Sequence, residues 1–421
     1  MDILYVSQYF PPEMGAPAAR ASELSYHWVS AGHQVTVLTG FPNHPTGTIP
    51  ENYRAPFRRL VFHETVRGVS VVRSWLLPFP NRKSWERMLN YSSFCLSSAL
   101  TGLQIPRPDL VIGSSPQLLV ALSAYWIARL KRVPFIFEVR DLWPESLSAV
   151  GVGGENSLLH RLLRGIASYL YSQADQVVVV TPAFKQFLAE KYQVPIDKIS
   201  IIPNGVETAH FSPEMKDEFL HRRLGIKSEF TVCYIGTLGM AHGLETLIEA
   251  ARRLQATHPQ ITFLIVGEGS EKQHLMNLAN ALRLKNVRFV DPQPRELVPQ
   301  FANASDAAAV LLKKSEVFKT VIPSKMLEFM SCARPVIAGV EGQAQELLQD
   351  AHAGICFEPG NVLALVDAIL TLFSQPSLRE SCGRNGRRYI IQNLSRKQTA
   401  FDYVNVLQNV LFPVSAKSRA A

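Results

Sequence analysis

Hydrophobic positions in this chain alternate between short, nearly unbroken apolar runs and longer segments with apolar residues three or four apart. The short runs are typical of buried parallel strands and occupy residues 3–6, 34–38, 109–113, 175–181, 199–202, 231–235, 286–290 and 307–311. Helical spacing follows many of them, as in residues 20–31, 117–130 and 244–254. Strands that alternate with helices predict an α/β fold with doubly wound parallel sheets, covered by helices on both faces.

The chain length of 421 residues favours two domains of roughly 200 residues over a single core. The first strand begins at the N-terminus without a basic segment or a cleavage site, so we expect no secretory signal. No uninterrupted apolar stretch reaches about 18 residues, so we expect no segment that spans a bilayer. Five scattered cysteines without a C-x-x-C pair favour reduced core residues in a cytoplasmic protein.

Several common ligand signatures are missing from the sequence. The loop after the first strand lacks G-x-G-x-x-G, which argues against a dehydrogenase. No D-x-D triplet, H-x-x-x-H pair or Cys/His cluster indicates a metal, so we expect neither a metal ion nor a cofactor. The formal charge of +8 gathers in residues 54–87 and 129–164, but no nucleic-acid-binding motif accompanies it, so we expect no nucleic-acid partner.

Residues 84–103 form a predicted helix whose bulky apolar side chains lie among serines, with Arg82, Lys83 and Arg87 at its start. The segment is too polar to span a membrane and unusually apolar for a helix exposed to water. One interpretation is an interfacial helix that contacts an anionic membrane surface. The alternative is an ordinary helix buried between the layers of its domain.

The stretch over residues 319–347 predicts a turn, a helix, a buried strand and a second helix. Pro323 ends the turn, and we expect Ser324 to be the N-cap of the helix. Free amides at the helix start, with Lys325 beside them, form an anion site. Glu328 lies one turn further on, where a hydroxyl-bearing sugar attached to a bound phosphate would be in reach. An amphipathic helix without a ligand is the alternative.

A second group of polar residues follows the predicted strand that ends at Val139. It contains Arg140, Asp141 and Glu145, with Trp143 between them. Ligands of open α/β sheets bind at the carboxyl ends of strands, so these residues are candidates for a substrate site.

The segment PSKMLEFMSCARPVIAG, residues 323–339, resembles the donor-site motif of the retaining glycosyltransferases of family four, which belong to the two-domain GT-B superfamily. The segment IIPNGVETAHF, residues 201–211, resembles the hinge of that family. The resemblance implies two Rossmann-like domains that face each other across a cleft. Residues 1–204 would bind the acceptor, residues 205–395 would bind the nucleotide sugar, and a final helix, about 396–421, would cross back to the first domain.

The resemblance also suggests site residues. It implies that the helix start around Ser324 and Lys325 contacts a diphosphate and that Glu328 binds the ribose hydroxyls. The other residues it places around the nucleotide are Gly236, Thr237, His242, Gly267, Glu268 and Val290, the last in a strand that reads the base edge. The expected catalytic residues are Arg140, Asp141 and Lys325, and the expected substrate-binding residues are Gly15, Glu145, Asn204 and Thr320. Gly15 could instead serve only as a turn.

The chain departs from the family pattern at several positions, four of them among the predicted site residues. Thr237 and His242 replace an Arg and a Lys that neutralise the diphosphate, so Lys325, Lys319, the helix dipole or His242 (protonated or as a neutral donor) would have to compensate. Arg140 replaces the usual His, a pattern shared with L-fucose and N-acetyl-L-fucosamine transferases of surface polysaccharide assembly. Thr320 replaces the first Glu of E-x7-E, which implies a deoxy or L-configured donor sugar or a loss of activity.

The function expected from the resemblance is retaining transfer of a sugar from a nucleoside diphosphate sugar. UDP is the first choice of nucleotide and GDP the second. The acceptor would be a polyprenyl-diphosphate-linked sugar at the inner face of the plasma membrane, where the protein would be peripheral. Two alternatives stay open: a non-hydrolysing sugar-nucleotide 2-epimerase, and an inactive transferase-like scaffold.

Overall fold

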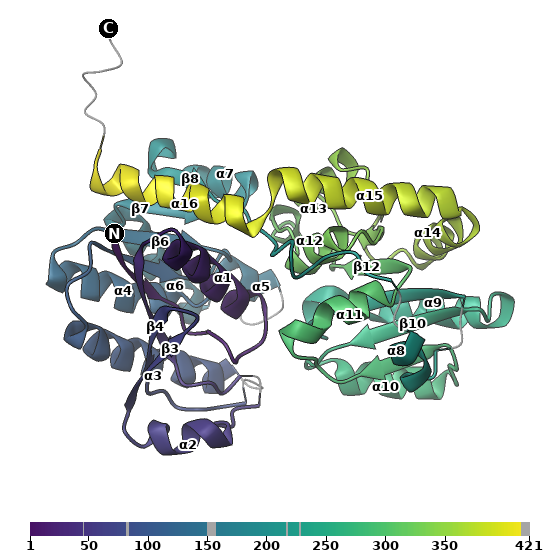
Figure 1. The fold of residues 1–421 in the computed structure, drawn as a ribbon, viewed down its shortest axis with the longest axis horizontal. Helices are drawn as coiled ribbons and strands as arrows, with labels where there is room; N and C mark the ends of the chain where they lie inside the picture. Colours follow the sequence, from purple (N-terminus) through teal and green to yellow (C-terminus); the bar gives the residue numbers. More distant parts are fainter. Residues whose placement is uncertain (45, 81–83, 150–156, 216–217, 227–228, 414–421) are drawn as a thin grey trace, which may run out of the picture. The chain divides into compact units, whose positions relative to one another are not determined.

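The computed structural model describes residues 1–44, 46–80, 84–149, 157–215, 218–226 and 229–413. The chain divides into two compact units (Figure 1). Unit 1 comprises Met1–Asn204 together with Arg396–Ala421, and unit 2 comprises Gly205–Ser395.

Unit 1 contains an eight-stranded sheet with β1 near its centre, in the order β3-β4-β2-β1-β5-β6-β7-β8. All neighbouring strands are parallel except β3 and β4, which form an antiparallel pair at one edge. The strands are β1 (Asp2–Val6), β2 (Gln34–Gly40), β3 (Val61–Val66), β4 (Val69–Ser74), β5 (Leu110–Ser114), β6 (Phe135–Val139), β7 (Gln176–Val179) and β8 (Ile199–Ile201).

The helices of unit 1 include the last helix of the chain, α16 (Arg396–Leu411), which packs on α1 (Ala16–Ser30). Trp28 of α1 is buried, its Nε1 donates a hydrogen bond of 3.1 Å to the carbonyl of Ala400, and its ring meets that of Tyr403 at 5.3 Å. The remaining helices are α2 (Glu51–Phe57), α3 (Ser84–Gln104), α4 (Leu118–Lys131), α5 (Glu145–Ala149), α6 (Leu158–Gln173) and α7 (Pro182–Lys191).

The first helix begins earlier than the apolar spacing predicts. We expected it from about residue 20, and α1 starts at Ala16. Pro17 lies in its first turn, where a proline is tolerated because the missing amide would have no partner in the helix. Gly15 precedes it with φ 121°, a backbone conformation that favours glycine.

Unit 2 contains a sheet of six parallel strands in the order β11-β10-β9-β12-β13-β14. Alternate residues of a strand point to opposite faces, so Cys233 and Tyr234 of β9 belong to different core clusters. Both faces are buried, which explains the nearly unbroken apolar runs. The strands are β9 (Phe230–Ile235), β10 (Ile261–Val266), β11 (Val287–Val290), β12 (Ala307–Leu311), β13 (Val336–Gly339) and β14 (Gly354–Phe357).

Helices cover both faces of this sheet. Met326, Phe329 and Met330 of α12 (Ser324–Ser331) are buried in the core, as their spacing predicts. The helix ends at Ser331, because Ala333 adopts φ 54° and the amide of Arg334 turns back to the carbonyl of Phe329 at 3.0 Å. The other helices are α8 (Glu218–Arg223), α9 (Glu245–Thr257), α10 (Lys272–Ala281), α11 (Val298–Asn303), α13 (Gln343–Asp350), α14 (Val362–Ser374) and α15 (Pro376–Asn393), with short 3-10 turns η1 (Ile196–Lys198) in unit 1 and η2 (Met240–His242), η3 (Arg295–Leu297) and η4 (Phe318–Thr320) in unit 2.

The two units therefore have the expected fold class, two Rossmann-like α/β domains built on parallel sheets. All five cysteines are free thiols, and four of them are buried. Within the described part of the chain, no single helix has the length and apolarity to cross a bilayer; α14 and α15 pass that test only when counted as one segment, bent by 100°.

Candidate functional site

Three loops meet at the carboxyl ends of the strands in unit 2. The amide of Gly236, after β9, donates to the carbonyl of Val266 at 3.0 Å, and the amide of Gly267, after β10, donates to the carbonyl of Val290 at 3.0 Å. The carbonyl of Glu268 accepts a hydrogen bond of 2.8 Å from Leu238. The structure thus brings together four of the residues predicted to surround a nucleotide.

Glycine is required where two of these loops touch. A Cβ atom on Gly267 would lie 1.9 Å from the carbonyl oxygen of Gly236, far inside van der Waals contact. Gly236 and Gly267 also have φ 140° and φ 149°, which other residues rarely adopt. The close approach places backbone, rather than side chains, at the ends of the strands.

Lys325 of α12 extends onto the same loop. A Cβ on Gly236 would lie 3.0 Å from its Nζ. The Nζ donates a hydrogen bond of 2.6 Å to the hydroxyl of Tyr234 and lies 4.0 Å from the centre of the Tyr234 ring, and the hydroxyl in turn donates to the carbonyl of Thr237 at 2.6 Å. Burial lowers the pKa of the Lys325 amine to about 7, although the charge of Glu328 opposes the shift.

Tyr234 is a site residue that the sequence analysis missed. It lies inside the apolar run of β9 and is fully buried, so its pattern is that of a core residue. The one available signal is its hydroxyl, because a buried tyrosine needs a hydrogen-bond partner.

The start of α12 differs from the prediction. Pro323, not Ser324, occupies the N-cap position, and no side chain among the described residues caps the helix. Pro323 is extended, with ψ 127°, and Ser324 is already the first helical residue. The prediction of Ser324 as the N-cap is therefore wrong. The uncapped start keeps the positive end of the helix dipole next to Lys325.

His242 lies in surroundings that disfavour its charged form. Burial lowers its pKa to about 3, assisted by the charge of Lys325. Its Nδ1 lies 3.2 Å from the carbonyl oxygen of Leu311, so Nδ1 carries the proton and Nε2 is an acceptor. The low pKa disfavours a protonated His242 in the free protein, and with its proton on Nδ1 the neutral ring has no proton on Nε2 to donate. Lys319 donates to Glu316 at 2.6 Å.

Glu328 is paired with a residue that the sequence analysis did not identify. Its carboxylate accepts from Arg295 of η3 at 2.8 Å, and the guanidinium of Arg295 lies 4.9 Å from the centre of the Phe211 ring. Both charged side chains are partly exposed. Thr320 of η4 donates to the carbonyl of Val317 at 2.6 Å.

A hollow of about 360 Å³ lies beside this site in unit 2. Its walls include His242, Gly243, Leu311, Lys313 and Gly360. Three residues that could hold a metal ion, Glu245, Glu271 and His274, have ligand atoms within 4.8 Å of one another, and they are partly or fully exposed. Exposed acidic groups gather in this way without a bound ion, and none of the predicted site residues belongs to this cluster.

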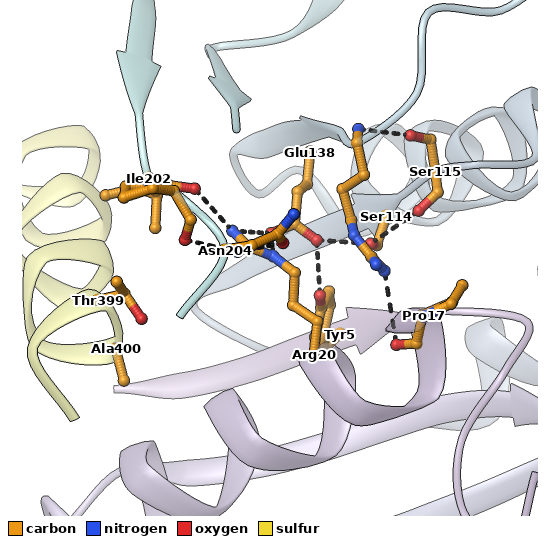
Figure 2. A network of polar contacts seen from close by, with 12 residues as sticks. Tyr5, Pro17, Arg20, Ser114, Ser115, Glu138, Ile202, Asn204, Thr399 and Ala400 are labelled. Carbon is orange, nitrogen blue, oxygen red and sulfur yellow. Dashed lines mark hydrogen bonds and ion pairs between the residues drawn. The ribbon is translucent and has the colours of Figure 1, made fainter. Parts of the chain in front are cut away.

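The predicted site of unit 1 is built around Glu138, a fully buried carboxylate of β6. Figure 2 shows Tyr5, Arg20 and Ser114 converging on it. Its Oε1 accepts from Arg20 at 2.9 Å and its Oε2 accepts from Tyr5 at 2.6 Å. Burial alone would raise its pKa, but the guanidinium groups of Arg20 and Arg140, with the hydrogen bonds, outweigh burial and lower the pKa.

Two of the predicted residues lie next to this carboxylate. Arg140 comes directly after β6, two residues beyond Glu138. Its amide donates to Ser115 Oγ at 2.8 Å, and its guanidinium donates to the carbonyl of Pro17 at 3.5 Å, close to Gly15 in the chain. Asn204 is held from the other side, because Arg20 donates to its Oδ1 at 3.3 Å (Figure 2).

Asp141 and Glu145 have different environments. Burial raises the pKa of the Asp141 carboxyl to about 6. Glu145 is buried and its Oε1 is bound by Lys191 and Tyr192, which lie at the end of α7, each at 2.9 Å. The structure therefore gives Glu145 a contact that ties α5 to the end of α7.

The fold and the site first define a general class of protein. Parallel strand ends that gather glycine loops at an uncapped helix start, with a lysine beside them, form an anion-binding arrangement of α/β proteins. Two family models identify the class further. "Glycosyl transferase 4-like domain" matches residues 15–205, and "Glycosyl transferases group 1" matches residues 216–389.

Similar proteins agree with this identification. The chain is 26% identical over 417 residues to WcaI of Escherichia coli (strain K12), a glycosyl transferase assigned to colanic acid biosynthesis, with 96% of this chain and 99% of that protein covered. The fold matches sucrose-phosphate synthase of Thermosynechococcus elongatus with a TM-score of 0.75, 19% identity, and 97% and 98% of the two chains covered. It also matches Anabaena HepE in complex with UDP-glucose, with a TM-score of 0.73, 16% identity, and 97% and 99% covered. The chain belongs to the GT-B glycosyltransferases and is related to family four.

Proposed function

We propose that this glycosyltransferase moves a sugar from a nucleoside diphosphate sugar to a lipid-linked sugar in surface polysaccharide assembly, with retention of the anomeric configuration. The observation that carries the donor assignment is Lys325, which lies on the Gly236 loop at the uncapped start of α12. UDP is the first choice of nucleotide, because the similar HepE structure holds UDP-glucose, and GDP is the second. The WcaI similarity supports a role in polysaccharide assembly.

In this proposal unit 2 binds the donor. The amides at the start of α12 and Lys325 stabilise the negative charge that develops on the leaving diphosphate. Glu328, oriented by Arg295, binds the ribose hydroxyls, and the backbone at Val290 contacts the base. The departing phosphate oxygen assists removal of the acceptor proton, so no protein nucleophile takes part.

Unit 1 binds the acceptor. Arg140 and Asp141 lie at the carboxyl end of its sheet and are the proposed contacts to the reacting sugars. Gly15 is close to Arg140 because Arg140 donates to the carbonyl of Pro17, and Asn204 is held in place by a hydrogen bond from Arg20. A fully buried Glu138 holds its neighbour Arg140 electrostatically, which orients the guanidinium.

A thermal-stability screen of sugar nucleotides tests the donor assignment. A ligand present at about 100 times its Kd adds roughly 2.7 kcal/mol to the stability of the native state, which raises the Tm by several degrees. We expect one family of UDP or GDP sugars to do so. The anomeric configuration of the transferred sugar, read by NMR, should equal that of the donor.

The alternatives give different results in the same experiments. An epimerase converts its sugar nucleotide in the absence of any acceptor. An inactive scaffold is stabilised by none of the sugar nucleotides. Inversion of the anomeric configuration would overturn the retaining mechanism while leaving the donor site intact.

We also propose that unit 1 contacts an anionic membrane, which would bring it to its lipid-linked acceptor at the inner face of the plasma membrane. Helix α3 buries one face, including Phe94, and exposes the other, where Leu96 and Leu100 are 61% and 67% accessible. Arg82 and Lys83, which we expected to assist, lie outside the described residues.

The exposed apolar face continues over two more helices. Helix α4 packs against both α3 and α6. Leu130 of α4 is 67% accessible, and Leu158 and Leu162 of α6 are 81% and 60% accessible. These three helices contain five basic residues and one acidic residue, which favours a surface of anionic lipid; the bases are Arg87, Arg129, Lys131, Arg161 and Arg164, and the acid is Glu86.

Co-sedimentation with vesicles tests this contact. We expect binding to phosphatidylcholine vesicles that contain phosphatidylglycerol, weaker binding without it, and at least a roughly tenfold loss in Leu96→Ser/Leu100→Ser. Leu363→Ser is the matched control, because Leu363 is equally exposed but lies on α14 of unit 2. Equal binding by all three proteins would remove the membrane contact from the proposal.

A further inference from the structure

We propose that donor binding in this chain is coupled to the uptake of one proton by Lys325, and that Tyr234 is the residue that positions the amine for it. This inference rests on the proposed donor site and adds a property to it. The carrying observation is a lysine that points into a glycine loop and has a phenol, not a carboxylate, as its partner.

The geometry holds the amine in one place. Its Nζ is bound at 2.6 Å by the Tyr234 hydroxyl, and the ring of the same residue lies beneath it. The hydroxyl is fixed because it donates to the carbonyl of Thr237. Tyr234 therefore accepts from Lys325 and cannot rotate away without losing its own acceptor.

The amine has no charged hydrogen-bond partner. Among the described residues, Lys325 forms no ion pair, and the nearby carboxylate of Glu328 is bound by Arg295. His242, from η2, is neutral. Burial raises the pKa of the Tyr234 hydroxyl far above neutral, so this group is uncharged as well.

An amine in these surroundings is partly unprotonated near neutral pH. Its pKa of about 7 reflects burial, which disfavours the ammonium ion. A diphosphate placed on the Gly236 loop would favour the ammonium ion and raise the pKa again. The free protein then binds fewer protons than the complex above about pH 7, and the difference is taken up from solvent when the donor binds.

The coupling follows from the presence of a single amine at the Gly236 loop. An Arg and a Lys at the positions of Thr237 and His242 would keep their charge at every physiological pH. This chain depends on one titrating amine instead, so its donor affinity should fall as the pH rises above about 7. Tyr234 decides where that fall begins, because its hydroxyl is the acceptor that favours the protonated amine.

Calorimetric titration with UDP measures the effect directly. With a free pKa of about 7 and a bound pKa above 9, we expect uptake of about 0.9 proton per UDP at about pH 8, measured in buffers of different ionisation enthalpy. The Kd should rise about 12- to 25-fold between about pH 7.5 and 9, the larger value for the higher bound pKa. In this range the terminal phosphate of UDP is fully ionised.

Lys325→Arg is the matched variant. It keeps the positive charge and titrates only above about pH 12, so it should take up no proton and lose the pH dependence. The uracil ring titrates equally in both complexes and cancels in the comparison. Tyr234→Phe should move the fall in affinity to lower pH, whereas a purely structural role of the hydroxyl would weaken binding equally at every pH.

The possible outcomes separate this inference from the proposed function. UDP binding without proton uptake, with Lys325→Arg and the natural protein showing the same pH profile, overturns the inference and leaves the donor site standing. Failure of both UDP and GDP to bind at any pH overturns the donor site and the inference with it. If Lys325→Arg does not fold, Lys325→Met gives the same comparison, because it also lacks a titrating amine.

Discussion

Replacing Arg20 by methionine removes the cation that is hydrogen-bonded to the fully buried carboxylate of Glu138. Arg20 and Glu138 are 1% and 0% exposed and pair at 2.9 Å. The same guanidinium donates to the carbonyls of Ile202 and Pro203 at 3.1 and 2.9 Å, where the chain leaves unit 1. Methionine keeps the volume of the side chain and supplies none of these hydrogen bonds.

The expected cost follows from the isolated charge. Removing one partner of a buried ion pair destabilises a protein by roughly 3–5 kcal/mol, because the other charge stays in the low-dielectric interior. For a domain of about 200 residues each kcal/mol lowers the Tm by about 2–4 °C, so the Tm of unit 1 should fall by roughly 6–20 °C. In Arg20→Met/Glu138→Gln the carboxylate is removed together with Arg20, so only the interaction of Glu138 with Arg140 is lost in addition, and we expect a smaller loss than in Arg20→Met.

Thermal unfolding followed by circular dichroism and calorimetry measures both variants. Arg252→Met is the control, because it breaks an exposed pair with Glu249 and should leave the Tm unchanged. The paired Glu138 has a lowered pKa, so the pair stabilises the fold above about pH 4 and loses its effect as the pH falls through the folded pKa. A loss of less than about 1 kcal/mol in Arg20→Met, or a double variant less stable than the single one, would refute the reasoning.

Three further predictions concern both units. Gly267→Ala places a Cβ 1.9 Å from the carbonyl oxygen of Gly236 at φ 149°, so it should destabilise unit 2 by roughly 2–5 kcal/mol and abolish UDP binding. Gly165→Ala is the control, because a Cβ there meets open space and should change neither stability nor binding. An unchanged Tm in Gly267→Ala would contradict the close contact. Asp141→Asn should raise the Tm at about pH 8 but not at about pH 4. Because the pKa of the Asp141 carboxyl is about 6 in the folded state, the ionised carboxylate destabilises the fold above that pH, and asparagine removes this cost. Equal effects at both pH values would contradict the burial of this carboxyl. Arg295→Met breaks a partly exposed ion pair, so it should change stability by less than about 1 kcal/mol. It should weaken UDP binding several-fold in calorimetry. Unchanged affinity would show that Arg295 does not orient Glu328.

Much of the fold could be predicted from the apolar pattern, because parallel strands buried on both faces are unbroken apolar runs. Four helices of unit 1 were not predicted: α2, α5, α6 and α7. The apolar residues of α6 do recur at helical spacing, with Leu163, Ala167 and Leu170 buried, so a signal for this helix was present in the sequence and was missed.

The candidate site could be predicted where the backbone sets it. The glycine loops, Lys325 and Glu328 follow from local sequence, because each lies at a strand end or a helix start. Tyr234 and Arg295 could not be found in this way, since their roles come from contacts with residues distant in the chain. The neutral state of His242 depends on burial, which only the folded structure determines.

The most direct test of the donor site compares UDP with 2′,3′-dideoxy-UDP by calorimetry, in the natural protein and in Glu328→Gln. If the carboxylate of Glu328 binds the ribose hydroxyls, the natural protein should prefer UDP by roughly ten- to a hundredfold, the value of one charge-assisted hydrogen bond. Glu328→Gln should bind UDP more weakly and the dideoxy nucleotide about equally well, so that most of the preference disappears. A preference of the same size in both proteins would contradict the account.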